Sequence, residues 1–358
     1  MQPHLILRVH TDLRLGLGHV ARALFIAEQW QALGGTATLA VSGDERARKV
    51  GSGQHPFLDQ PLALEAVDLG TDLHAPLPED LKQRANLVLV DQWDITPEQL
   101  QALRPLKLAV MEDDGDTHEL ADLLFQPFLE GLSWPSNPMK VVNGRKIRPH
   151  ETAHGTCRVL RGAGFIVVNP LAASLRPRRE PLQPLAVHKL LVSFGGTDGP
   201  GLAQRAYDVL ASLAAADRWR GTCTLLAPQG IKGKPFSGCT VQPSLPNLTR
   251  RLTDYDAIWC AGGLTISECM CMGIPVAAWG QNERQHHILA DIAMVNGCFS
   301  LGVGPEADLR ATEDALEHWL GPEGQETRQE QARDGMALVD GTAASRIAQE
   351  LWTLAGQV

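Results

Sequence analysis

A short apolar run that leads through a glycine-rich turn into a helix is the feature that most constrains this chain. Residues 5–9, Leu-Ile-Leu-Arg-Val, are rich in branched side chains and predict a buried strand. The turn holds Gly16, Gly18 and His19, and apolar residues recur at helical spacing after it, up to a stop signal at Gly34. Glycines let a ligand approach the backbone closely, and the first N–H groups of a helix favour an anion. This unit therefore predicts a ligand site that His19 faces.

The same alternation of strands and helices continues along the chain. Such alternation is typical of parallel sheets with crossover helices, which is the α/β class. Further strands are expected at residues 37–41, 87–90, 106–111, 189–194, 222–227, 256–260 and 274–279.

A stretch rich in proline and charge interrupts this pattern midway. We interpret residues 176–184 as an interdomain linker between a first domain, residues 1–175, and a second domain, residues 185–358. Residues 343–352 are helical in pattern and are expected to close the fold, and this last helix could cross back to the first domain.

The bulk properties narrow the class of function. The 358 residues carry a net charge of -9, which argues against a partner that is a nucleic acid, because such binding depends on a cationic surface. No apolar run approaches the ~20 residues needed to span a bilayer, and no signal peptide is evident. The seven cysteines lack the paired spacings of zinc or redox sites, so we expect reduced thiols and a cytoplasmic protein.

Polar clusters follow two of the expected strands. Asp91 follows residues 87–90, and the acidic run 112–116 follows residues 106–111. Ligands of open α/β sheets bind at this carboxyl edge. Carboxylates suit a metal ion, but the spacing has no calcium-loop pattern, so we expect no metal and favour solvated or capping roles. Asp91 and Asp113 could still orient sugar hydroxyls.

Residues 130–164 have a looser pattern, with prolines, turn dipeptides and several basic residues. They predict a loop or hairpin, which is either a functional flap or a mobile insertion. Its basic residues are more often a solvated face than an anion site.

The second half repeats the strand, glycine turn and helix. Gly196 and Thr197 follow the strand at 189–194, and a second turn follows the strand at 256–260 with the residues Gly262, Gly263, Leu264 and Thr265. Two glycines at a helix start predict a phosphate cradle. Glu268 could bind both hydroxyls of a ribose or could complement the helix dipole, and the sequence leaves both open.

Polar residues also end the strand at 274–279. Gln281, Asn282 and Glu283 follow it directly. Amide side chains at the carboxyl end of a strand suit contact with a sugar.

These motifs together resemble one enzyme family. Residues 16–22, 191–198 and 261–268 resemble the UDP-sugar hydrolases of pseudaminic acid biosynthesis, which in turn are similar to the inverting UDP-N-acetylglucosamine transferase that makes lipid II. The likeness extends to residues 90–93, 111–114 and 281–284 and so covers most of the chain. It implies a GT-B fold, in which two Rossmann-like domains with parallel sheets face a central cleft.

The resemblance also implies roles for individual residues. It makes His19 a general base, places Asn282 against the sugar or phosphate, and gives Glu268 the ribose of UDP. The segments 196–198 and 262–268 would hold uridine diphosphate, with no metal and no cofactor, since the UDP-sugar is the substrate.

The nucleophile that the resemblance implies is water, which makes the protein a hydrolase that releases UDP. Two features differ from the family pattern: Glu283 stands where a glutamine is usual, and residues 169–176 lack the family tyrosine. The alternative is an inverting glycosyltransferase with a glycan, lipid or small-molecule acceptor. A third hypothesis is a nucleotide-sugar-binding module without catalysis.

Overall fold

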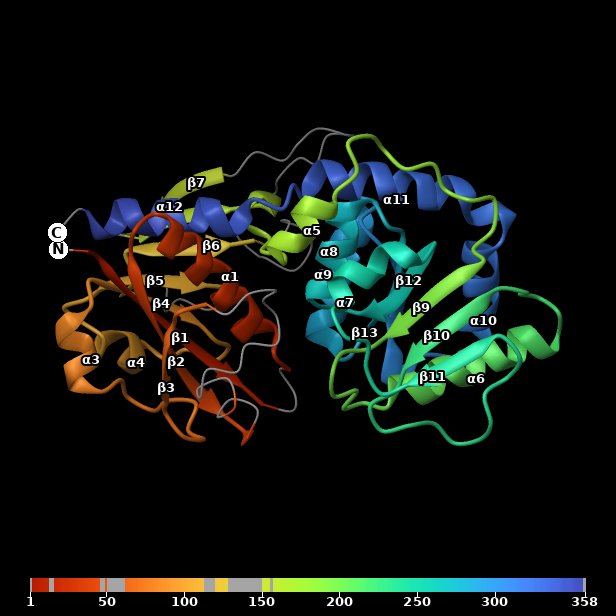
Figure 1. The fold of residues 1–358 in the computed structure, drawn as a ribbon, viewed down its shortest axis with the longest axis horizontal. Helices are drawn as coiled ribbons and strands as arrows, with labels where there is room; N and C mark the ends of the chain where they lie inside the picture. The colour runs from red at the N-terminus through yellow and green to blue at the C-terminus, as the bar shows by residue number, and fades with distance from the viewer. Residues whose placement is uncertain are drawn as a thin grey trace. The chain divides into compact units, whose positions relative to one another are not determined.

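The computed structural model describes residues 2–12, 16–45, 49, 62–112, 120–127, 150–154 and 157–356. They form two compact α/β units (Figure 1). One unit holds the described residues within Met1–Phe128, Ile147–Pro170 and Thr342–Val358, and the other holds Leu171–Gly341. The chain therefore passes from the first unit to the second after Pro170 and returns to the first at Thr342.

The first unit is built on an eight-stranded sheet with the order β3-β2-β1-β4-β5-β6-β8-β7. Every pair in it is parallel except the pair of β7 and β8 at the edge. The strands are β1 (His4–Thr11), β2 (Thr36–Gly43), β3 (Glu65–Asp68), β4 (Leu87–Asp91), β5 (Lys107–Met111), β6 (Leu123–Gln126), β7 (His150–His154) and β8 (Cys157–Arg161).

The hairpin of β7 and β8 falls inside the segment 130–164, for which the sequence predicts a loop or hairpin. β8 also joins the parallel sheet beside β6. Sequence reasoning missed this strand because arginines at residues 158 and 161 interrupt its apolar run. Residues 130–149, which carry most of the expected flap, lie outside the described residues.

The first sheet is buried on both faces, which explains the nearly continuous apolar strands. On one face, Ile6 packs in a cluster with Leu81 of α3 (Glu79–Arg84) and Leu100 of α4 (Pro97–Gln101). On the other face lie α1 (Gly18–Ala32) and α12 (Ala343–Ala355), which pack on each other. Their contact includes the rings of Trp30 and Trp352, whose centroids are 5.1 Å apart.

The second unit has a six-stranded, fully parallel sheet with the order β11-β10-β9-β12-β13-β14. Its strands are β9 (Lys189–Ser193), β10 (Thr222–Leu226), β11 (Cys239–Gln242), β12 (Ala257–Ala261), β13 (Val276–Gly280) and β14 (Phe299–Val303). Its helices are α5 (Pro170–Leu175) at the boundary, α6 (Leu202–Ala215), α7 (Leu248–Arg251), α8 (Leu264–Met272), α9 (Glu283–Met294), α10 (Leu309–Leu320) and α11 (Gln325–Leu338).

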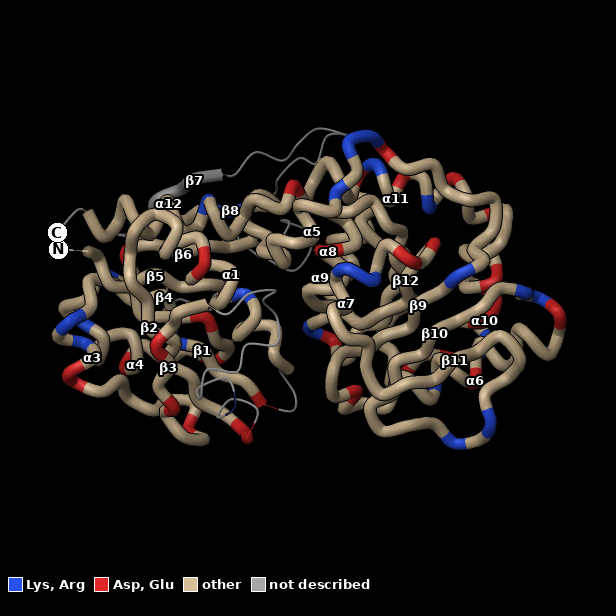
Figure 2. The backbone as a smooth tube through the Cα atoms, viewed as in Figure 1, with Lys and Arg blue, Asp and Glu red and all other residues tan. Residues whose placement is uncertain are grey.

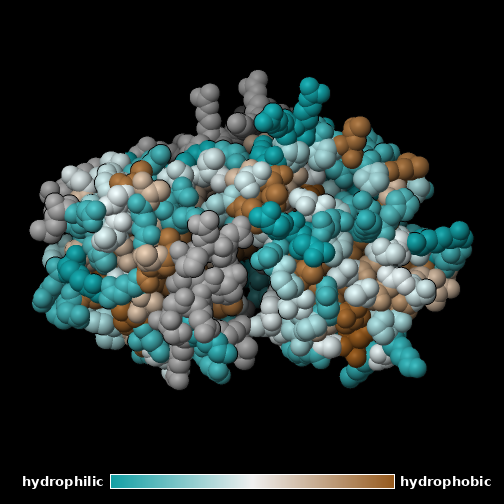
Figure 3. Space-filling view, viewed as in Figure 1, coloured by the Kyte–Doolittle hydropathy of each residue, from teal (hydrophilic) through white to brown (hydrophobic). Residues whose placement is uncertain are grey.

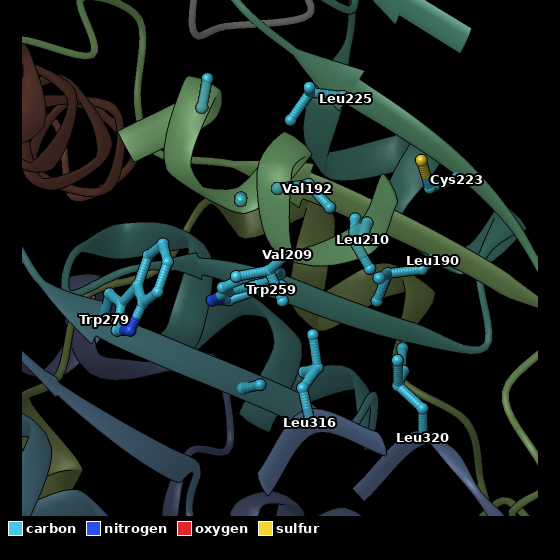
Figure 4. Packing of buried hydrophobic residues seen from close by; sticks show 14 of the residues in the cluster. Leu190, Val192, Val209, Leu210, Cys223, Leu225, Trp259, Trp279, Leu316 and Leu320 are labelled. Atoms are coloured by element: carbon cyan, nitrogen blue, oxygen red, sulfur yellow. The ribbon is translucent and has the colours of Figure 1, made fainter. Parts of the chain in front are cut away.

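A tryptophan-rich core lies between the second sheet and the helices α6 and α10 (Figure 4). Trp259 of β12 and Trp279 of β13 have ring centroids 4.6 Å apart, and Phe194 stacks on Trp279. Phe194 directly follows β9, and Trp279 is the residue before the last of β13, so these rings pack beside the turns that follow the two strands. The packing therefore holds those turns on a rigid base.

Both sheets have the strand order of a dinucleotide-binding fold. In each, the strand order reverses beside the first strand, between β1 and β4 in one unit and between β9 and β12 in the other. Ligands of such sheets bind at the carboxyl ends of the strands at this switch point. The glycine turns after β1, β9 and β12 are therefore at the positions where this topology places ligands.

The surface of the described chain is of mixed character. Basic and acidic residues are distributed over both units (Figure 2), and on the face shown in Figure 3 the hydrophobic residues form small separate patches. Among the helices that the structure describes, none combines the length and the apolar character that a membrane crossing requires.

Candidate functional site

The first glycine turn delivers His19 to the start of α1. Gly16 has a φ of +69°, its N–H donates to the Asp12 carbonyl at 2.9 Å, and its own carbonyl accepts from the Thr11 hydroxyl. A Cβ added at Gly16 or Gly18 would meet no heavy atom of the described residues within 4 Å, so these residues leave the backbone open on this side of the turn. Hydrogen bonds thus fix the conformation of the turn, while the side of Gly16 and Gly18 is open to a ligand.

His19 is held by a carboxylate from the neighbouring strand across the switch point. Its Nδ1 lies 2.7 Å from Oδ1 of Asp91, the last residue of β4. Trp93 meets the imidazole edge-on, with centroids 5.8 Å apart at 90°. Because the carboxylate accepts the Nδ1–H, the lone pair of a neutral imidazole is on Nε2. His19 keeps only 7% of its surface exposed, so one orientation of the ring is fixed.

Two further residues, Arg22 and Glu112, complete a buried charge network. Arg22 lies one helical turn after His19, and its guanidinium donates from Nε to Asp91 Oδ2 at 2.7 Å and from Nη2 to Oδ1 at 2.5 Å. Its Nη1 donates to Glu112, which follows β5 with a φ of +58°. The four side chains therefore join α1, β4 and β5 at the carboxyl edge of the sheet.

Charge pairing keeps the Asp91 carboxylate ionised. Burial by itself would raise its pKa, but the Arg22 guanidinium, followed by His19, outweighs burial and lowers the pKa to about 2. The pKa of Arg22 is raised by Asp91 and Glu112 against the opposing effect of burial. The network thus presents His19 with a permanently charged partner at neutral pH.

We expect Asp91→Asn to destabilise the fold in a pH-dependent way. At pH 7 it should lower the free energy of unfolding by roughly 3–5 kcal/mol, because Arg22 is left buried with less compensation. Since the folded pKa of about 2 lies below the ordinary value of 3.8, the contribution of Asp91 is fully present above 3.8 and is lost as pH falls towards 2. Urea unfolding of wild type and variant between pH 2 and 7 should therefore show the difference shrinking at acid pH.

The exposed pair of Asp217 and Arg220 supplies a matched control. Asp217→Asn should change the unfolding free energy little, because water screens that pair. An Asp91→Asn difference that stays constant from pH 7 to pH 2 would contradict the expectation.

The second unit brings most of its expected residues together at its own switch point. Gly196 and Thr197 lie in the turn after β9, and Gly262 and Gly263 lie after β12. Gln281, after β13, is joined to the segment that follows β9, because its side-chain amide donates to the carbonyl of Phe194 at 2.8 Å. A Cβ at Gly196 or Gly263 would have no heavy atom within 4 Å.

The start of α8 lies in this open region. Leu264 and Thr265 are its first two residues, Gly263 is its N-cap, and no side chain of the described chain caps it. Gln285 approaches Gly262 from the side and bonds to the backbone N–H of Gln281 at 3.0 Å. This N-terminus can therefore offer backbone N–H groups to an anion.

Glu268 does not cap the helix. It is the fifth residue of α8, beyond the first turn, and is only 6% exposed. Its Oε1 lies 3.2 Å from the Thr249 hydroxyl on α7. Because Glu268 lies beyond the first turn of α8, its position does not favour the helix-dipole interpretation, and the ribose interpretation stays a prediction.

Asn282 caps a helix, a role that the sequence did not predict. Its Oδ1 accepts from the backbone N–H of Gln285 at 3.0 Å, so it is the N-cap of α9. Asn282 and Glu283 are both exposed. The side-chain amide N–H groups of Asn282 could still reach a ligand while the oxygen caps the helix.

Several residues of these two candidate sites, one in each unit, were not singled out from the sequence. Arg22 could have been found, since a charged residue three positions after a helical histidine shares its face. Glu112 was seen only as part of an acidic run, and Asp113 lies outside the described residues. Gln285 gave no signal, because its role depends on the approach of α9 to the β12 turn. Among the described residues, no three histidine, cysteine or acidic side chains group as a metal site would require.

The fold is GT-B, with two Rossmann-like units of parallel strands. No family model matches the chain, and no curated protein matches it either. Solved structures match it over nearly its whole length: MurG of Acinetobacter baumannii (TM-score 0.61, 12% identity, 98% of this chain and 99% of that chain) and LpCGTa in complex with UDP (0.62, 13%, 99% and 100%). A third is the glycosyltransferase SnogD from Streptomyces nogalater (0.54, 16%, 99% and 100%). At these identities the likeness establishes the fold.

Proposed function

We propose that the protein is an enzyme that uses a UDP-sugar as donor and His19 as the general base. The observation that carries this proposal is the buried hydrogen bond between His19 and Asp91 at the switch point of the first sheet. A histidine whose Nδ1–H is bound by a carboxylate is oriented to accept a proton at Nε2. A purely binding loop has no need of such a pair.

The second unit is the proposed site of the nucleotide. The uncapped start of α8 and the open glycine turns after β9 and β12 support binding of a diphosphate through backbone N–H groups. Glu268 is the proposed partner of the ribose hydroxyls. One solved structure with a similar fold is described as a complex with UDP.

The proposed reaction is inverting transfer of the sugar to a hydroxyl group. His19 Nε2 takes the proton of the acceptor hydroxyl while its oxygen attacks the anomeric carbon, and the bond from that carbon to the diphosphate oxygen breaks. Asp91 stabilises the imidazolium that forms. The departing UDP takes up the negative charge, which the N-terminus of α8 stabilises. The likeness to the glycosyltransferase SnogD supports transfer of the sugar to an acceptor.

Water is the second candidate nucleophile. The ordered motifs at residues 16–22, 191–198 and 261–268 favour it, because they resemble the UDP-sugar hydrolases of pseudaminic acid biosynthesis. In this version His19 deprotonates water, and the products are UDP and the free sugar. The base and the donor residues are the same in both versions.

A donor screen with and without acceptors distinguishes the two. The protein is incubated with a set of UDP-sugars, including amino sugars, and released UDP and sugar products are measured. UDP release that requires an added glycan, lipid or small-molecule hydroxyl supports the transferase. Steady release at enzymatic rates without acceptor supports the hydrolase. Absence of turnover in every mixture, together with stabilisation by UDP, would favour a binding module instead.

We expect Gly263→Val to weaken UDP binding without harming the fold. Gly263 has a φ of 179°, which any residue adopts, and its added Cβ meets no atom within 4 Å. The branched side chain would instead fill the space in front of α8. The Kd for UDP, measured by calorimetry, should rise about tenfold or more, which corresponds to ~1.4 kcal/mol.

The unfolding midpoint of ligand-free Gly263→Val should equal that of wild type, which separates loss of binding from loss of structure. Unchanged affinity for UDP would remove the start of α8 from the proposed site.

A further inference from the structure

Two cysteines lie opposite each other at the amino ends of strands in the second sheet. Cys223 on β10 is the register partner of Cys239 on β11, so the two side chains project from the same face. Neighbouring strands are about 4.8 Å apart, which is within the Cα separation of roughly 4.4–6.8 Å that a disulfide spans.

One member of this pair, Cys239, differs from the other cysteines in access. All seven cysteines are free, and Cys239 is the one that is not buried. Cys239 and Cys223 both line a cavity of about 320 Å³, together with Lys189 and Tyr255. Cys223 itself lies at the rim of the apolar core, where Figure 4 shows it beside Leu190 and Leu210.

The pKa values of the thiols also distinguish Cys239 from the buried cysteines. The neighbouring Cys223 thiol lowers the pKa of Cys239 although burial opposes it. Burial raises the pKa of Cys298 to about 12 and raises the pKa of Cys260 further. The thiolate is the reactive form of cysteine, so Cys239 is the nucleophile that an oxidant would meet first.

We propose that Cys223 and Cys239 form an oxidisable dithiol site that a hydroperoxide converts into a reversible disulfide. The Cys239 thiolate attacks the peroxide oxygen, the O–O bond breaks, and sulfenic acid and hydroxide form. The Cys223 sulfur then attacks the Cys239 sulfur, the S–O bond breaks, and the hydroxyl leaves as water with the Cys223 proton. A small thiol reductant restores both thiols by exchange.

The site is separate from the proposed donor residues. Cys223 and Cys239 are at the amino ends of β10 and β11, whereas Gly196, Gly263 and Gln281 follow the carboxyl ends of their strands. The inference therefore stands or falls independently of the proposed function.

The test is disulfide mapping of the whole folded chain. The protein is treated with hydrogen peroxide, alkylated under denaturing conditions, digested with trypsin without reduction, and examined by mass spectrometry. Lys232 lies between the two cysteines, so cleavage there separates their peptides unless a disulfide joins them. We expect a Cys223–Cys239 linked pair of peptides that dithiothreitol abolishes, with the other five cysteines alkylated.

Two variants sharpen this result. Cys223→Ser should abolish the linked peptides and leave Cys239 as sulfenic or higher oxidised acid, which shows that Cys223 is the resolving thiol. Cys298→Ser, which removes a buried thiol of the same unit, should leave the linkage unchanged. The proposal is overturned if peroxide oxidises Cys239 in the wild type without forming the linkage, or if Cys239 pairs with a different cysteine.

Discussion

His19→Ala is expected to reduce turnover of the UDP-sugar by roughly 10²-fold or more, as loss of a general base commonly does. The kcat of the variant should fall, with little change in the affinity for UDP, because the nucleotide is proposed to bind the second unit. Steady-state kinetics with the donor identified by screening, together with calorimetry of UDP, checks both parts.

The exposed His318 on α10 supplies a control for this experiment. His318→Ala should leave turnover unchanged. Circular dichroism and the unfolding midpoint of His19→Ala show whether the first unit remains folded. Undiminished turnover in a folded His19→Ala protein would show that His19 is not the base. Stabilisation by UDP with no turnover in either protein would indicate a binding module.

Much of the fold follows from local sequence patterns. Runs such as residues 87–90 and 257–260 are buried on both faces of their sheets, and a strand in that position must be almost entirely apolar. That pattern is visible without tertiary information. β8 was missed because Arg158 and Arg161 lie in an otherwise apolar strand, and Arg158 gains a distant partner, Glu350 of α12, that no local pattern can show.

The sequence predicts the residues of the candidate sites only where they lie in or beside one glycine-rich turn. The glycines at 16, 18, 262 and 263 and His19 are within such turns, so their sequence is sufficient to locate them. Partners from other strands were not predictable in the same way. Asp91 was expected at a sheet edge, but its bond to His19 depends on β1 and β4 being neighbours, and that depends on the topology of the whole sheet.

Arg22 is the cation of the buried network, and its removal should lower stability about as much as the loss of the Asp91 charge. Asp91 and Glu112 both depend on its guanidinium, and all three side chains are buried. Arg22→Met should lower the free energy of unfolding by roughly 3–5 kcal/mol, because two carboxylates then remain buried without their cation. Urea denaturation measures this change.

The Arg22→Lys variant distinguishes the contribution of the positive charge from that of the guanidinium geometry. Arg22→Lys keeps a cation but cannot donate to both oxygens of Asp91 and to Glu112 in one plane, so its stability should lie between those of wild type and Arg22→Met. In both variants the pKa of Asp91 should rise, because the strongest attraction that lowers it is weakened.

The pH dependence of activity then distinguishes positioning from simple destabilisation. If Arg22 keeps Asp91 charged so that Asp91 can hold His19, the acid limb of kcat/KM should move to higher pH in Arg22→Lys, under conditions where the protein is fully folded. A variant that is less stable but has the wild-type pH profile would show that Arg22 only supports the fold. A shifted profile would instead make the guanidinium part of the machinery that orients the base, by acting through Asp91.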